Sequence, residues 1–196
     1  MAEIETGKTN VELEAKFLDI DKEAIIGKLK SLGAVDLGED LLREIIFYDQ
    51  DLNWMRERHT QNRLVRLRQS KDGLVLAYKH QLKPVNLETK EIELKVDDVQ
   101  KTTQLLEEIG LVAYRRQEKK RHAFVLDHTH IDIDTWPSAP PLLEIEAETE
   151  TEIRHAAKQL GLDWAKAVFE NSGAVLRIYY DIHVGELHDY TFSKIG

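Results

Sequence analysis

Val11-Glu12-Leu13-Glu14-Ala15-Lys16-Phe17 alternates apolar and charged side chains near the start of the chain. A period of two is typical of a half-buried β-strand, so Glu12, Glu14 and Lys16 are predicted to share one face. Neighbouring carboxylates repel one another, and such a face therefore looks into water or holds something cationic. Mg²⁺, Mn²⁺ and Ca²⁺ prefer carboxylate oxygens as ligands. For one isolated copy of the pattern, the solvated outer face of an antiparallel sheet would be the better interpretation.

The acidic pattern occurs twice more along the chain. Glu91-Ile92-Glu93-Leu94-Lys95 repeats it, and Leu143-Glu144-Ile145-Glu146-Ala147-Glu148 repeats it with Glu in the place of Lys. Each copy is followed by a helix-like segment that ends in an apolar residue and a glycine, at Leu32-Gly33, Ile109-Gly110 and Leu160-Gly161. Because three strand–helix units carry the same acidic face, the acidic residues are not interpreted as a chance feature of an exposed surface.

Composition narrows the class of protein. The chain has 196 residues, of which 42% are hydrophobic and 32% charged, and this fits one ordinary domain with a buried core. We expect residues 1–10 to be a disordered leader and residues 11–196 to form the single domain. Cysteine is absent, so any metal must be held by oxygen or imidazole, and the net charge of −9 disfavours a general nucleic-acid binder. No apolar run is long enough to cross a membrane and no signal peptide is recognisable, so a cytoplasmic location without a membrane partner is expected.

Charged side chains alternate in the same way along four further predicted strands. Leu67 lies opposite Arg66 and Arg68, and Ile131 and Ile133 lie opposite Asp134, whereas Lys79 shares its face with Val75 and Ala77. These strands and the residues on their charged faces are 63–69 with Arg66 and Arg68, 74–80 with Lys79, 114–126 with Lys119 and Arg121, and 130–136 with Asp134.

Helices are predicted after each of the three acidic strands. The helix over 98–109 is predicted to turn Leu105, Leu106 and Ile109 inward. Residues 163–180 are also predicted to be helical.

Strands with one apolar and one charged face predict an α+β barrel. Six to eight such strands cannot stack as a sandwich, because that would bury the charged faces against each other. They can curl into a barrel with the apolar faces outward under helices and the charged faces around a wet lumen. Carboxylates for a metal beside several cations for a polyanion are the requirements of a metal–phosphate site. A set of surface ion pairs on an exposed sheet remains open as the alternative.

The charged strands also resemble, in kind and in order, those of the CYTH family, the triphosphate tunnel metalloenzymes. That family includes class IV adenylyl cyclases, thiamine triphosphatases and inorganic triphosphatases. The similarity runs from about residue 11 to residue 182. The matching segments are Glu12-x-Glu14-x-Lys16 with the opening E-x-E-x-K, Leu64-Val65-Arg66-Leu67-Arg68 with the L-R-x-R strand, Ala77-Tyr78-Lys79 with the lysine strand, Glu91-Ile92-Glu93 with the central E-x-E, Lys119-Lys120-Arg121 with the K-x-R strand, His130-Ile131-Asp132-Ile133-Asp134 with the aspartate strand, and Leu143-Glu144-Ile145-Glu146 with the closing E-I-E.

The resemblance implies an eight-stranded antiparallel β-tunnel with helices packed outside, and a role for each charged residue. Lys16 would lie beside the metal, Asp134 would bind the metal or position the nucleophile, and Glu91 and Glu93 would orient the basic residues or bind a second metal or its water. The residues implied to hold one or two Mg²⁺ or Mn²⁺ ions are Glu12, Glu14, Glu144 and Glu146. The residues implied to grip the phosphates are Arg66, Arg68, Lys79, Lys119 and Arg121.

Three classes of function are compatible with these residues. A metal-dependent triphosphatase would act on tripolyphosphate, thiamine triphosphate or a nucleotide, and a class IV-type adenylyl cyclase would convert ATP to cyclic AMP and pyrophosphate. A binding module would need the basic face without the complete acidic set, so we rank it last. A cyclase also needs a fixed purine pocket, because positioning supplies most of the rate. The segment 53–62, where the family match is poorest, is the expected source of such a pocket, so the sequence favours the triphosphatase. Assembly as a homodimer is compatible with the sequence.

Overall fold

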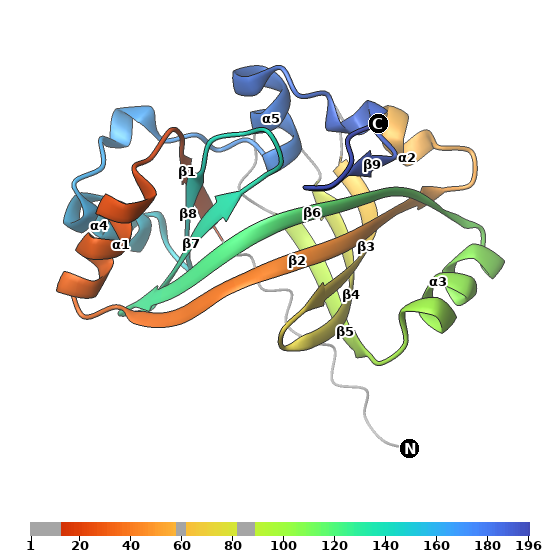
Figure 1. The fold of residues 1–196 in the computed structure, drawn as a ribbon, viewed down its shortest axis with the longest axis horizontal. Coiled ribbons are helices and arrows are strands. Elements are labelled where there is room, and N and C mark those ends of the chain that lie inside the picture. Colours follow the sequence, from red (N-terminus) through yellow and green to blue (C-terminus); the bar gives the residue numbers. More distant parts are fainter. Residues whose placement is uncertain (1–12, 58–61, 82–88) are drawn as a thin grey trace.

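The computed structural model describes residues 13–57, 62–81 and 89–196. They form one sheet in the order β1-β8-β7-β6-β2-β3-β4-β5, in which all neighbours are antiparallel, with β9 running parallel to β6 (Figure 1). The strands are β1 (Leu13–Phe17), β2 (Val35–Asp49), β3 (Asn62–Ser70), β4 (Gly73–Gln81), β5 (Thr89–Val96), β6 (Leu111–Leu126), β7 (Thr129–Thr135), β8 (Leu142–Ala147) and β9 (Asp189–Tyr190). The helices are α1 (Lys22–Ser31), α2 (Asn53–Arg56), α3 (Val99–Glu108), α4 (Glu150–Leu160) and α5 (Ser172–Tyr180), with 3₁₀ turns at Trp164–Lys166 and Val184–Glu186.

The apolar faces of the strands lie under helices. Ile131 and Ile145 are fully buried in a core formed with α1 and α4. A second cluster around Phe47 and Leu67 lies under Leu106 of α3. These two clusters cover the convex side of the curled sheet, so the charged side chains are left on the concave side. The predicted α+β fold, an eight-stranded antiparallel β-tunnel with helices packed outside, is confirmed in the form of a curled half-barrel, with α1, α3 and α4 on its outside.

The edge strand β1 pairs with a segment that lies outside the eight-strand order. Among the described residues, no backbone pairing joins β1 to β5. Instead, the backbone of Lys16 in β1 exchanges two hydrogen bonds with Val168, at 2.8 and 2.9 Å. The chain after α4 therefore lies along the free edge of β1 and brings α5 over the concave side of the sheet.

Two details of the helices differ from the sequence prediction. In α3 only Leu106 is buried, whereas Leu105 and Ile109 are 61% and 67% exposed, because the helix contacts the sheet along a narrow line. Residues 163–180 are not one helix: the extended residue Val168 pairs with β1, and α5 begins at Ser172 after an Asn171 cap that accepts a hydrogen bond from the Ala174 N–H.

Candidate functional site

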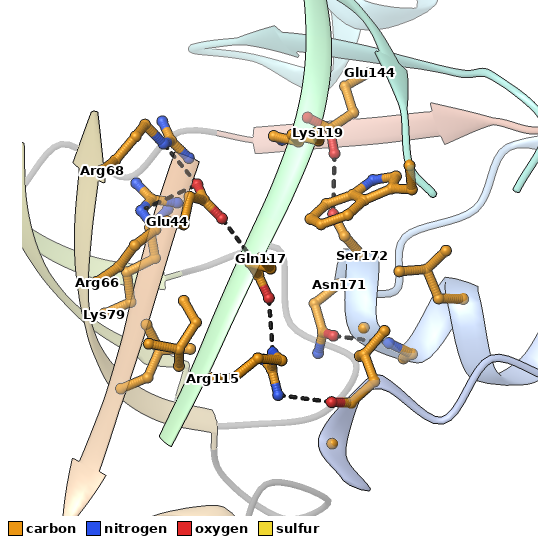
Figure 2. A pocket seen from close by; sticks show the side chains of 18 of the residues that line it. Glu44, Arg66, Arg68, Lys79, Arg115, Gln117, Lys119, Glu144, Asn171 and Ser172 are labelled. Carbon is orange, nitrogen blue, oxygen red and sulfur yellow. Dashed lines mark hydrogen bonds and ion pairs between the residues drawn. The ribbon is translucent and has the colours of Figure 1, made fainter. Parts of the chain in front are cut away.

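A cavity of about 770 Å³ occupies the concave side of the sheet, between the strands and α5 (Figure 2). Lys16 and Asp134 have no exposed surface and lie behind its lining, in contact with residues that form it. Glu12 lies outside the described residues. The other predicted site residues all line the cavity; they are Glu14, Arg66, Arg68, Lys79, Glu91, Glu93, Lys119, Arg121, Glu144 and Glu146.

One wall of the cavity carries three crowded cations from β3 and β4. Arg66 Nη2 lies 3.3 Å from Glu91 Oε1, and Lys79 Nζ lies 2.7 Å from Glu91 Oε2. Burial and the charge of Arg68 lower the pKa of Arg66 to about 10, and burial and Arg66 likewise lower the pKa of Lys79. Within the described part of the chain, Arg66 Nε is buried without a hydrogen-bond partner. Cations that are held so close together, with an unused donor among them, favour a bound polyanion.

Glu44 of β2 lies between the two arginines, and sequence reasoning missed it. It accepts a hydrogen bond of 2.7 Å from Arg68 Nε and one of 2.6 Å from Gln117 Nε2, and its Oε1 is 3.7 Å from Arg66 Nε. Only 4% of Glu44 is exposed. Burial opposes its charge, but Arg68 and Arg66 outweigh burial and lower the pKa of Glu44 far below its usual range.

The opposite wall joins two cations of β6 to carboxylates of β7 and β8. Asp134 accepts hydrogen bonds from Lys119 at 2.5 Å and from Arg121 at 2.7 Å, and Arg121 also donates to Glu144 at 2.6 Å and pairs with Asp132. Burial works against the charge of Arg121, but Asp134 and Glu144 outweigh it and raise the pKa of this guanidinium. Asp134 thus fixes both cations from behind the cavity wall.

The carboxylates at the β1–β8 end suit a divalent cation. Glu14 lies directly opposite Glu146 in the strand register, and like charges in that arrangement destabilise a sheet unless a cation offsets them. Lys16 Nζ lies 2.6 Å from Glu14 and 3.8 Å from Glu144; burial opposes its charge, but these two carboxylates raise the pKa of Lys16. The oxygen donors fit Mg²⁺ or Mn²⁺. Among the described residues, no three acidic or histidine side chains come together in a ready-made coordination set.

Glu91 and Glu93 of β5 lie on the wall of crowded cations, beside Arg66 and Lys79. Burial opposes the charge of Glu91, but Lys79 outweighs it and lowers its pKa, whereas burial and the neighbouring Glu91 raise the pKa of Glu93. Their contacts to Arg66 and Lys79 favour the first of the two predicted roles, that of orienting the basic residues.

Several lining residues were not predicted as site residues. Ser172 Oγ, from the first turn of α5, donates to Glu144 at 3.2 Å, and nothing in the strand pattern indicates it. Arg115 and Gln117 share the parity of Lys119 and Arg121, so extending that alternation would have found them. The unpredicted polar residues of the lining include Glu44, Arg115, Gln117, Asp132 and Ser172.

No helix among the described residues combines the length and the apolar character needed to cross a membrane.

Solved structures share the fold at low sequence identity. A protein from Pyrococcus horikoshii OT3 is 22% identical, with a TM-score of 0.65 over 82% of this chain and 96% of that chain. A Vibrio parahaemolyticus protein described as a candidate adenylate cyclase is 14% identical, with a TM-score of 0.69 over 84% of this chain and 97% of that chain. A Hippeastrum protein described as a candidate adenylyl cyclase with a dominant triphosphatase activity is 14% identical, with a TM-score of 0.59 over 85% of this chain and 94% of that chain.

The comparison with curated proteins found no match. The family model of the CYTH domain, in contrast, matches residues 10–175, which is most of the chain. Its range includes all the strands that line the cavity and the first turn of α5. The chain therefore belongs to the CYTH domain family, a family of triphosphate-binding tunnel enzymes.

Proposed function

We propose that this protein hydrolyses inorganic triphosphate or a small organic triphosphate with the help of Mg²⁺ or Mn²⁺. The observation that supports it is the convergence of five predicted cations from β3, β4 and β6 on one cavity whose other end carries opposed carboxylates. These cations are Arg66, Arg68, Lys79, Lys119 and Arg121. A row of phosphates carries several negative charges, and basic groups on facing walls can neutralise them while holding the chain of phosphates in line.

The chain's own residues would divide the work between two ends of the cavity. Arg66, Arg68 and Lys79 bind phosphate oxygens on one wall, and Lys119 and Arg121, fixed by Asp134, bind them on the other. Glu14, Glu144 and Glu146, with Glu12, would hold the divalent cation. Such a cation, when bound, offsets charge on phosphate oxygens and lowers the pKa of water. Lys16 keeps its proton and holds Glu14 in place.

The size of the cavity bears on the substrate. About 770 Å³ is more room than a bare triphosphate needs, and Ile46, Tyr48 and Leu64 contribute apolar side chains to the lining. A small organic group attached to the triphosphate can therefore be accommodated. The same observation keeps the adenylyl cyclase as the second candidate, since ATP carries such a group.

One assay separates the two candidates. Purified protein is incubated with tripolyphosphate, thiamine triphosphate or ATP and with Mg²⁺ or Mn²⁺, and the products are separated. Orthophosphate from tripolyphosphate or thiamine triphosphate is expected, with ATP as a poorer substrate. Cyclic AMP and pyrophosphate from ATP, with no orthophosphate from tripolyphosphate, would overturn the triphosphatase in favour of the cyclase.

A further inference from the structure

A chain of hydrogen bonds crosses the floor of the cavity from β3 to the C-terminal segment. Gln117 Nε2 donates to Glu44 at 2.6 Å, and Gln117 Oε1 accepts from Arg115 Nε at 2.8 Å (Figure 2). Arg115 Nη1 then donates to the backbone carbonyl of Val184 at 2.8 Å. Four elements, β3, β2, β6 and the turn after α5, are thereby connected through side chains.

The three middle members of this chain are buried. Glu44, Gln117 and Arg115 are 4%, 8% and 7% exposed. Buried polar groups are costly unless they are hydrogen-bonded, and here each group has a partner on both sides. The pairing also fixes the orientation of the Gln117 amide, because its oxygen must face the Arg115 donor and its nitrogen the Glu44 carboxylate.

The contact between Glu44 and Arg68 determines which edge of the guanidinium can meet a ligand. Glu44 occupies Nε, and among the described residues this is the hydrogen bond that the Arg68 guanidinium makes. The two terminal nitrogens of Arg68 therefore keep their donors for an acceptor in the cavity. Bidentate recognition of phosphate needs such a pair of parallel N–H groups in a fixed direction.

We infer that Glu44 and Gln117 are positioning residues, which hold Arg68 in the orientation that binds phosphate and, through Arg115, connect it to the Val184 turn over the cavity. This inference rests on the proposed triphosphate site and assigns a function to residues that bind neither metal nor substrate. Preorganised donors spare a ligand the cost of ordering them, so loss of the chain weakens binding without removing any ligand contact.

The test is a double-mutant cycle on tripolyphosphate binding. Affinity is measured by calorimetry in EDTA, so that no turnover occurs, at a temperature where circular dichroism shows every variant folded. Glu44→Gln and Gln117→Leu are expected to weaken binding about tenfold and about fivefold, as for hydrogen bonds to charged groups. In an Arg68→Ala background, Glu44→Gln is expected to change affinity less than twofold, because its effect acts through the missing guanidinium. A general destabilisation of the fold would give the same factor in both backgrounds.

Glu39→Gln is the matched control. Glu39 is also on β2 and is also ion-paired, with Lys22 Nζ at 2.5 Å, but it does not line the cavity. Its substitution is expected to leave affinity for tripolyphosphate unchanged.

Hydrogen exchange tests the far end of the chain. Tripolyphosphate is expected to slow exchange of the backbone amides of residues 184–187 in the wild-type protein, and Gln117→Leu is expected to abolish that protection. Equal effects of Glu44→Gln in both backgrounds, or wild-type affinity of Gln117→Leu, would overturn the inference.

Measurements of binding and of turnover distinguish the positioning role from the proposed triphosphatase activity. If Glu44 and Arg68 are coupled in tripolyphosphate binding but no orthophosphate is released, the positioning role stands and the proposed triphosphatase activity is refuted. A protein that hydrolyses tripolyphosphate without coupling refutes the positioning residues alone. A wild-type protein that does not bind tripolyphosphate in EDTA refutes the positioning residues, and one that does not bind it with Mg²⁺ or Mn²⁺ either refutes both.

Discussion

Glu14 of β1 and Glu146 of β8 lie directly opposite one another in the antiparallel register. Their mutual repulsion gives Glu146→Gln two effects of opposite sign. In EDTA the substitution is expected to stabilise the fold by about 0.5 kcal/mol, or to raise the melting temperature by roughly 1–2 °C, because a like-charge pair is removed. In Mn²⁺ titrations followed by electron paramagnetic resonance, the same variant is expected to bind the ion at least tenfold more weakly. Loss of stability in EDTA together with unchanged Mn²⁺ affinity would contradict the cation site. Glu148→Gln, at an exposed position just beyond β8, serves as the control.

Charge reversal at Arg68 tests the phosphate wall. Arg68→Glu is expected to raise the KM for the triphosphate that proves to be turned over by about tenfold or more, since it places a carboxylate where phosphate oxygens would bind. Steady-state kinetics at fixed Mg²⁺ measures the change. Arg43→Glu, on the outer face of the neighbouring strand and 57% exposed, is expected to leave KM within twofold of the wild type. Equal KM values for Arg68→Glu and Arg43→Glu would indicate that Arg68 forms a surface ion pair and does not bind phosphate.

The lowered pKa of Glu44 predicts that the unfolding free energy of the protein depends on pH. Its pKa in the folded protein lies below the ordinary value of 4.5, because Arg68 and Arg66 outweigh burial. The carboxylate therefore contributes stability that is complete above the pKa of the unfolded chain and is lost as the pH falls toward the folded pKa. The difference in unfolding free energy between wild type and Glu44→Gln is expected to be on the order of 2 kcal/mol at neutral pH and to shrink below about pH 4.5. Urea unfolding between pH 7 and pH 3 measures it, and a difference that grows on acidification would contradict the sign.

The buried hydrogen bond of Tyr190 is predicted to stabilise the C-terminal segment. Its hydroxyl donates to the Pro137 carbonyl at 2.6 Å, the side chain is fully buried, and its ring stacks on Trp136 with centroids 6.0 Å apart. Tyr190→Phe keeps the stacking and leaves the carbonyl without that donor, so a loss of about 1–2 kcal/mol is expected in chemical denaturation. Tyr179→Phe, at a ring that is 47% exposed, is expected to change stability by less than about 0.5 kcal/mol.

Sequence alone could predict the strands and which face of each is charged, because a period of two fixes the face of every residue. That is why Arg66, Arg68, Lys119 and Arg121 reach one cavity as expected. Glu44 escaped prediction because its nearest neighbours on that face of β2, Leu42 and Ile46, are apolar. Its importance appears only from the register, which puts it opposite Arg68 on one side and Gln117 on the other.

The helices show which structural features the apolar pattern of the sequence does not determine. The apolar spacing of α3 does not say how wide its contact with the sheet is, so Leu105 and Ile109 were wrongly placed inside. The break between α4 and α5 depends on the pairing of Val168 with Lys16, a contact between residues far apart in the chain. Such contacts are set by packing rather than by local propensity.

The two hydrogen bonds between Lys16 and Val168 also affect how copies of the protein can associate. A strand at the end of a sheet offers unpaired backbone groups to any other extended chain, and this is a common route to edge-to-edge aggregation. Here the protein's own chain occupies the edge of β1 at Lys16, the fourth residue of this five-residue strand. A neighbouring molecule that added a strand at this edge would first have to displace Val168 and the adjoining chain that leads into α5. The closure that places α5 over the cavity therefore also shields the protein from growth of the sheet at β1.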